Sequence, residues 1–242
     1  MNQFNQSYNN GSGISQSMSG AEAQANVRGF LLRVYNWMAM GLAITGLTAY
    51  AISTSQELTA LVLTPFVFFT IIIGQFLLIL GINKIISSMG STAGVGAFFL
   101  YAFATGVLFS TLFLRYTHAS IYSTFFVCAM MFGAVSFLGY ITKIDLSKFS
   151  TFLYMGLFGI IISSLVNLFL QSSTMYWIIS NVGVLVFCGL TAYDTQKIKQ
   201  MAFRSEADSE SGKREAIFGA LQLYLDFINM FLFLLRILGS RR

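Results

Sequence analysis

Seven long apolar runs dominate this chain of 242 residues and restrict what it can fold into. A helix rises about 1.5 Å per residue, so about 20 apolar residues cross the roughly 30 Å hydrocarbon core of a bilayer. Hydrocarbon also requires each crossing segment to satisfy its own backbone polar groups, which a helix does. The sequence therefore predicts an all-α membrane protein, a bundle of seven transmembrane helices within residues 28–242. The expected spans are 30–53, 61–82, 93–114, 121–141, 152–170, 177–197 and 216–238.

Composition and the polar segments support this interpretation. Only 10% of the residues are charged, whereas a soluble domain carries roughly 25%. The net charge of +5 is scattered between the apolar runs, so a nucleic-acid partner is not expected. Residues 1–27 are polar and contain no apolar signal core, which predicts a disordered tail and no cleavable signal. The stretch 200–215 is expected to be the one substantial internal loop.

The distribution of lysine and arginine predicts the orientation. With the N-terminus in the cytoplasm, ten of the fourteen basic residues fall in cytoplasmic segments, as the positive-inside rule requires. The four on the outside are Arg115, Arg236, Arg241 and Arg242. Three of these follow the last apolar run, so a re-entrant seventh segment with both ends in the cytoplasm stays open as an alternative.

Two carboxylates lie inside apolar runs, where an ionisable group is costly and therefore a functional candidate. Gln222, Asp226 and Asn229 stand at i, i+4 and i+7 and share one stripe of the last helix. Such a stripe should face the bundle interior or a wettable cavity, which predicts that helix seven is central. Asp194 is followed closely by Lys197, so a solvated ion pair at a helix end is an equally open interpretation. Asp226 could also be a buried hydrogen-bonded residue that only fixes packing.

Four ordered motifs resemble signatures of the Bax inhibitor-1 family, in its bacterial branch. The first two surround the aspartates: Gly-Leu-Thr-Ala-Tyr-Asp-Thr-Gln-Lys-Ile-Lys at 189–199, and Gly-Ala-Leu-Gln-Leu-Tyr-Leu-Asp-Phe-Ile-Asn-Met-Phe-Leu at 219–232. The others are Gly-Tyr-Ile-Thr-Lys-Ile-Asp-Leu-Ser at 139–147 and Met-Gly-Leu-Phe-Gly-Ile-Ile-Ile-Ser-Ser-Leu-Val-Asn at 155–167. The resemblance covers nearly everything after the tail.

The resemblance implies a seven-helix bundle with helix seven at its centre, in the bacterial inner membrane. It also implies a pH-sensitive calcium leak, in which residues matching Asp194 and Asp226 form a hydrogen-bonded pair that closes the pore toward the cytoplasm. Eukaryotic members restrain cell death and stress signalling, and one bacterial member modulates a membrane protease. We accordingly expect the lipid bilayer and a membrane protease or another membrane complex as partners, and no cofactor beyond Ca²⁺ as the permeant ion.

An aspartate pair is chemically suited to sensing protons. Two carboxyls in one low-dielectric site cannot both ionise cheaply, so they titrate as a coupled unit. A shared proton would hold the helices together, and its loss would favour opening or cation entry. Asp194 and Asp226 would form only a weak, incomplete Ca²⁺ site, which suits permeation better than storage. Gln222, Asn229 and Tyr193 are expected to line or support the path.

The depths of the two aspartates present a difficulty. Counting from Trp177 puts Asp194 about 25 Å below the outer interface, whereas counting back from Arg236 puts Asp226 only about 15 Å below it. Contact between them therefore requires helix tilt, an axial offset of helix seven, or a deep position for Arg236. The run 61–82 contains no basic residue, so the arginine latch that some family members carry in helix two is not expected.

Two other functions remain as alternatives to a channel. An intramembrane aspartyl protease also places two aspartates on adjacent helices, but that class uses Gly-x-Gly-Asp and a Pro-Ala-Leu element. This chain has Leu-Tyr-Leu-Asp at 223–226 and no proline beyond Pro65, so we expect no enzymatic activity. A non-conducting regulator of a membrane protease or of a stress or cell-death pathway would use the tail and the stretch 200–215 as contact regions.

Overall fold

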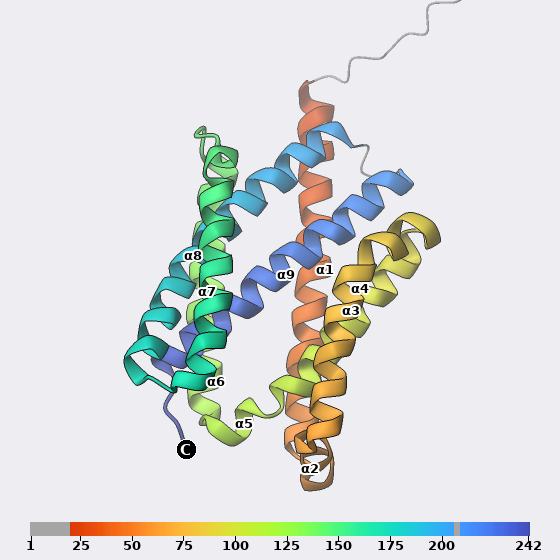
Figure 1. The fold of residues 1–242 in the computed structure, drawn as a ribbon. Helices are drawn as coiled ribbons and strands as arrows, with labels where there is room; N and C mark the ends of the chain where they lie inside the picture. The colour runs from red at the N-terminus through yellow and green to blue at the C-terminus, as the bar shows by residue number, and fades with distance from the viewer. Residues whose placement is uncertain (1–19, 206–208) are drawn as a thin grey trace, which may run out of the picture.

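A computed structural model of the chain shows long helices that run between two ends of a bundle (Figure 1). The structure describes residues 20–205 and 209–242, and in these residues seven helices are long and apolar enough to cross a membrane. This confirms the prediction of an all-α membrane protein. The elements are α1 Gly20–Ser53, α2 Gln56–Leu63, α3 Pro65–Met89, α4 Ser91–Phe109, α5 Leu112–Arg115, α6 His118–Ile141, the 3₁₀ helix η1 Leu146–Phe149, α7 Ser150–Leu170, α8 Ser173–Arg204 and α9 Glu210–Leu238.

Several helices extend beyond the apolar runs that predicted them. Helix α1 begins at Gly20, inside the expected tail 1–27, of which residues 1–19 lie outside the described part of the chain. The stretch 200–215 was wrongly expected to be a loop, because α8 continues to Arg204 and α9 begins at Glu210. Residues 206–208 are not described. An apolar run marks the part of a helix that suits hydrocarbon, and a polar helix end can continue into water.

The apolar run expected at 61–82 is divided between two helices. Thr64 separates α2 from α3 and has extended backbone angles, with ψ at 123°. Pro65 is the first residue of α3, a position where its missing N–H is tolerated. Proline also disfavours the helical conformation of the residue before it, which ends α2 at Leu63.

Hydrogen bonds of Asn26 and of Arg242 identify the two ends of the bundle. At the α8–α9 end, Asn26 Nδ2 donates to the Ser205 carbonyl at 2.9 Å and joins the start of α1 to the end of α8. At the opposite, C-terminal end, the Arg242 N–H donates to the Arg115 carbonyl at 3.0 Å. The 29 residues of α9 extend about 43 Å between these ends. A complete seventh crossing therefore fits the structure better than a re-entrant segment.

Helix α9 is much more buried than the helices at the periphery. In its apolar window 72% of the residues are buried, against 6% for the spans that contain α3 and α7. It packs against α1, α4, α6 and α8, and its blue ribbon crosses the bundle obliquely in Figure 1. The exposed apolar side chains of α3 and α7 suit contact with lipid tails. That helix seven forms the centre of the bundle stays a prediction, which this burial favours.

Polar side chains connect the helices inside the bundle. The Tyr224 hydroxyl of α9 lies 2.7 Å from Thr45 Oγ1 of α1, which donates to the Ala102 carbonyl of α4 at 2.8 Å. Gln75 Nε2 of α3 donates to Thr105 Oγ1 of α4 at 2.7 Å. Hydrogen bonds between helices help hold a bundle together, because apolar surfaces gain little by leaving lipid for protein.

The Tyr224–Thr45 contact should be measurable as a coupling energy. Tyr224→Phe and Thr45→Val each remove one hydroxyl, and the double variant removes both. We expect a coupling of about 1 kcal/mol between the two changes, read from unfolding free energies in detergent. Strictly additive effects would mean that this hydrogen bond contributes nothing to stability.

Candidate functional site

Two buried aspartates lie on the paired helices α8 and α9. Asp194 of α8 is 6% exposed and Asp226 of α9 is 5% exposed. Both lie within candidate membrane spans, and their helix neighbours Leu190, Ile198 and Leu223 are buried apolar side chains. Both acids are therefore buried inside the protein, beside apolar side chains of their own helices.

The two carboxyls lie close to one another. Their side chains are within hydrogen-bonding and coulombic range of one another. A carboxylate can only accept hydrogen bonds, so a bond between two carboxyls requires a proton on one of them. Among the described residues, Asp194 Oδ1 and Asp226 Oδ2 are buried without a hydrogen-bond partner. These two atoms leave the site able to accept a proton, a water molecule or a cation.

An axial offset between α8 and α9 brings the two acids closer in depth than the sequence count suggests. The Phe233 ring lies against Gly183, where an added Cβ would approach it to 2.7 Å, and Gly219 faces Ile198. The Arg236 guanidinium lies 5.5 Å from the Tyr176 ring, although Gly183 lies about 10 Å further along α8 than Tyr176. The backbone of Arg236 therefore lies deeper in the bundle than Tyr176, and its side chain extends back toward the C-terminal end. Counted from the Gly183–Phe233 contact, Asp194 lies eleven residues and Asp226 seven residues further in, so this offset lowers the difference in depth from about 10 Å to about 6 Å.

Aromatic and basic side chains border the pair. Tyr154 of α7 is within electrostatic range of both aspartates and of Tyr193, and the two tyrosine rings lie 6.3 Å apart. Lys197 is within coulombic range of Asp194, and its ammonium group lies 5.9 Å from the Phe218 ring of α9. Tyr193 thus lies next to Tyr154, and its role in lining or supporting a path stays a prediction. Tyr154 was missed, because a single phenol near the start of an apolar run is a weak signal.

The other two residues of the polar stripe have different surroundings. Among the described residues, Gln222 Oε1 is buried without a hydrogen-bond partner, one turn from Asp226. Asn229 Nδ2 donates to the Leu225 carbonyl of its own helix at 2.8 Å. Gln222 therefore adds a free acceptor near the pair, whereas the amide nitrogen of Asn229 is occupied locally. A pore-lining role for either residue stays a prediction.

A layer of hydroxyl groups fixes α8 next to Asp194. Thr195 Oγ1 lies 2.9 Å from Ser136 Oγ of α6, and the same Ser136 hydroxyl is hydrogen bonded to Tyr35 of α1. This chain links α1, α6 and α8 at the level of the acids. Serine, threonine and tyrosine are ordinary residues in membrane helices, so the sequence did not single them out.

The connection between α6 and α7 is attached to α8 two residues beyond Asp194. The Gln196 side chain accepts from the Leu146 N–H and donates to the Ile144 carbonyl, both at 2.8 Å. In this connection the side-chain hydroxyl and the backbone N–H of Ser147 donate to Asp145 and lower the pKa of its carboxyl below the usual value. Asp145 is thus an exposed, readily ionised acid, unlike the buried pair.

The pair offers few ligands for a tightly bound metal ion. Within the described residues there is no group of three or more His, Cys, Asp or Glu side chains that could hold one. Calcium ordinarily takes six to eight oxygen ligands in a specific site. Two carboxylates with one nearby amide oxygen therefore supply only part of such a ligand set.

Comparisons with known proteins cover almost the whole chain. The family model described as "Inhibitor of apoptosis-promoting Bax1" matches residues 27–242. The chain is 43% identical over 229 residues to the inner membrane protein YbhL of Escherichia coli K12, covering 94% of this chain and 98% of YbhL. It is 44% identical over 214 residues to an uncharacterized protein of Borreliella burgdorferi, covering 88% and 92% of the two chains. An uncharacterized membrane protein of Streptococcus pyogenes, SpyM3_0260, is 29% identical over 221 residues, covering 90% and 95%.

Proposed function

The chain belongs to the Bax inhibitor-1 family, and we propose that it is a pH-sensitive calcium-leak channel gated by Asp194 and Asp226. It is an integral membrane protein, like its inner-membrane relative YbhL. The observation that carries the proposal is the contact between two buried acids on adjacent helices, each with one unpaired oxygen.

A shared proton would act as the closing element. While one carboxyl is protonated, the hydrogen bond joins α8 to α9 across the site. When that proton leaves, two negative charges face each other in a medium of low dielectric, where repulsion is strong. The helices then separate or a cation enters between the charges, so conduction rises as the pH rises.

The proposed orientation places the α8–α9 end in the cytoplasm. Ten of the fourteen basic residues belong to segments at this end, which is the bias that the positive-inside rule describes. Asp194 is ten residues before Arg204, the last residue of α8, or about 15 Å from the end of the helix. The pair would close a path from its cytoplasmic side. The basic residues are Arg28, Arg33, Lys84, Lys143, Lys148, Lys197, Lys199, Arg204, Lys213 and Arg214.

Calcium flux in proteoliposomes tests the proposal. Purified protein is reconstituted with a Ca²⁺ indicator inside the vesicles, and entry of external Ca²⁺ is followed at a series of pH values. We expect a slow leak that increases with pH and that empty liposomes do not show. Flux equal to that of empty liposomes at every pH would contradict the channel, and a non-conducting regulator would then be the better account.

A further inference from the structure

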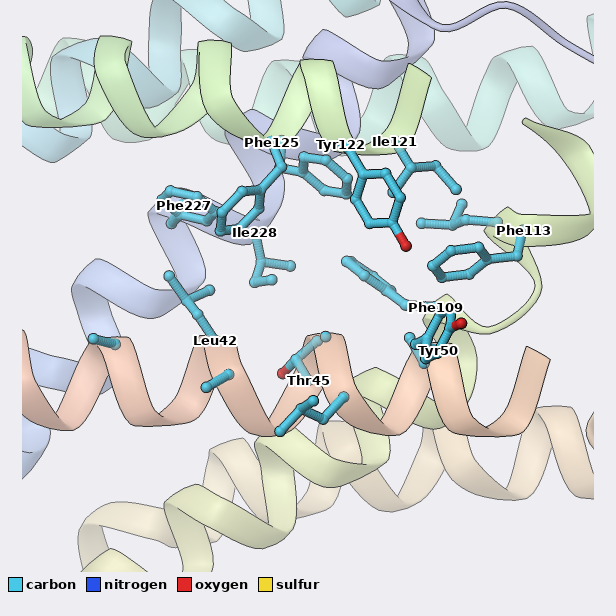
Figure 2. Close-up of a pocket in the computed structure, with 17 residues that line it drawn as sticks. Leu42, Thr45, Tyr50, Phe109, Phe113, Ile121, Tyr122, Phe125, Phe227 and Ile228 are labelled. Carbon is cyan, nitrogen blue, oxygen red and sulfur yellow. The ribbon is translucent and has the colours of Figure 1, made fainter. Parts of the chain in front are cut away.

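An apolar crevice of about 590 Å³ separates α1 from α6 (Figure 2). Leu42 and Tyr50 of α1 form one wall, and Tyr122 and Phe125 of α6 form the other. Side chains of α9, among them Phe227, form the floor, on the helix that carries Asp226. Phe109 and Phe113 close the crevice toward the C-terminal end.

Small residues on α1 create this space. Ala39, Ala43 and Gly46 line the crevice at i, i+4 and i+7 and so share one face of the helix. A Cβ added at Gly46 would meet nothing within 4 Å. Helices α1 and α6 each pack against α9, and the crevice keeps them apart. The protein therefore leaves a hollow in which α1 offers little side-chain volume.

The surroundings of the crevice identify hydrocarbon as its occupant. Both walls belong to candidate membrane spans, so the open side faces lipid tails. The lining contains few polar groups, and the Thr45 hydroxyl among them is already bonded to Tyr224 and Ala102. A buried water molecule needs two to four polar partners, and apolar cavities stay dry. An acyl chain fits this lining, whereas water does not.

Basic residues gather at the C-terminal end of the same crevice. The His118 ring lies 5.1 Å from the ring of Phe113, which lines the crevice. Arg115 follows Phe113 by two residues, and its carbonyl accepts from the backbone of Arg242 at 3.0 Å. In the described part of the chain, Glu57 carries the one acidic side chain in the segments at this end, where Arg115, Arg236, Arg241 and Arg242 lie. An excess of positive charge here complements a lipid phosphate.

We propose that this crevice binds one acyl chain of an anionic phospholipid, with the headgroup phosphate held beside Arg115 and Arg242. The chain would lie along Phe227 and fill the space between α1 and α6. The site is separate from the aspartate pair, so it stands or falls independently of calcium conduction.

Native mass spectrometry of the delipidated protein, titrated with phosphatidylglycerol, tests the crevice. Gly46→Phe places a ring in the hollow, and Gly74→Phe places the same ring on α3, where an added Cβ likewise meets nothing within 4 Å. We expect wild type and Gly74→Phe to bind one lipid with equal affinity, and Gly46→Phe to bind it at least tenfold more weakly. Equal affinity in all three proteins would overturn the site.

Two further measurements do not depend on the Gly46→Phe variant folding. A phosphatidylglycerol with a photoreactive acyl chain should label wild-type protein at crevice residues such as Phe125 and Ile228. Labelling confined to the exposed faces of α3 and α7 would overturn the proposal. The combined change of Arg115→Gln and Arg242→Gln should lower the preference for phosphatidylglycerol over phosphatidylcholine of the same chains several-fold. An unchanged preference would contradict the phosphate contact.

Discussion

Replacing Asp226 by asparagine is expected to abolish the pH response of calcium flux. Asparagine keeps the shape of the side chain and cannot ionise, so no second negative charge forms opposite Asp194. Two unit charges about 4 Å apart repel by roughly 4 kcal/mol at an effective dielectric of 20, and 1.4 kcal/mol corresponds to about tenfold in a population. The ratio of flux at high pH to flux at low pH should therefore fall from at least about tenfold to about one.

Two comparisons make this result specific to the pair. Asp145→Asn removes an exposed aspartate from the α6–α7 connection and should leave the pH response unchanged. Asp194→Asn should abolish the response as fully as Asp226→Asn. The double variant should do no more, because each single change already destroys the coupled carboxyl pair. Separate, additive contributions from Asp194 and Asp226 would show that the two acids do not act as a pair.

Gly139→Ala is expected to produce a large loss of stability for so small a substitution. A Cβ at this position would lie 2.4 Å from the Ala192 carbonyl oxygen and 2.8 Å from its Cα. The obstacle is backbone, so α6 and α8 must move apart two residues away from Asp194. Overpacking typically costs about 1–3 kcal/mol, and the rigidity of backbone puts the expected cost near the upper limit.

Gly133→Ala is the matched control for this prediction. Gly133 lies on the same helix, and an added Cβ there meets nothing within 4 Å. Alanine is the better helix former by about 0.8–1 kcal/mol, so this variant should be neutral or slightly more stable. Thermal unfolding in detergent measures both changes. Equal midpoints for the two variants would contradict the close approach of α6 and α8.

The seven crossings could be predicted from the sequence because hydrocarbon imposes a simple requirement. A segment in the membrane must be apolar and must satisfy its backbone internally, so the runs of apolar residues indicate the helices directly. The ends of the helices follow other rules. Helix α9 begins where the Ser209 side chain accepts from the Gly212 N–H at 3.0 Å, and such a cap cannot be told from any other serine in a polar stretch.

From the sequence, buried acids could be predicted as candidate site residues, but not how their positions along the helices match. Charged residues are so costly in an apolar run that Asp226 was identifiable from sequence alone. Helical periodicity, however, gives only the face of a helix and says nothing of axial displacement. The offset that brings Asp226 closer in depth to Asp194 accompanies the packing of Phe233 against Gly183. Such a pairing between distant residues becomes visible only in the folded structure.

Infrared spectroscopy of the aspartate carboxyl groups tests the shared proton most directly. Protein carrying isotope-labelled aspartate is titrated in lipid vesicles, and the C=O stretch of the protonated carboxyl is followed in parallel with calcium flux. The account predicts one protonated aspartate whose band disappears over the same pH range in which flux rises, and whose titration changes in Asp226→Asn but not in Asp145→Asn. A pair that stays fully ionised throughout this range, while flux still responds to pH, would contradict it.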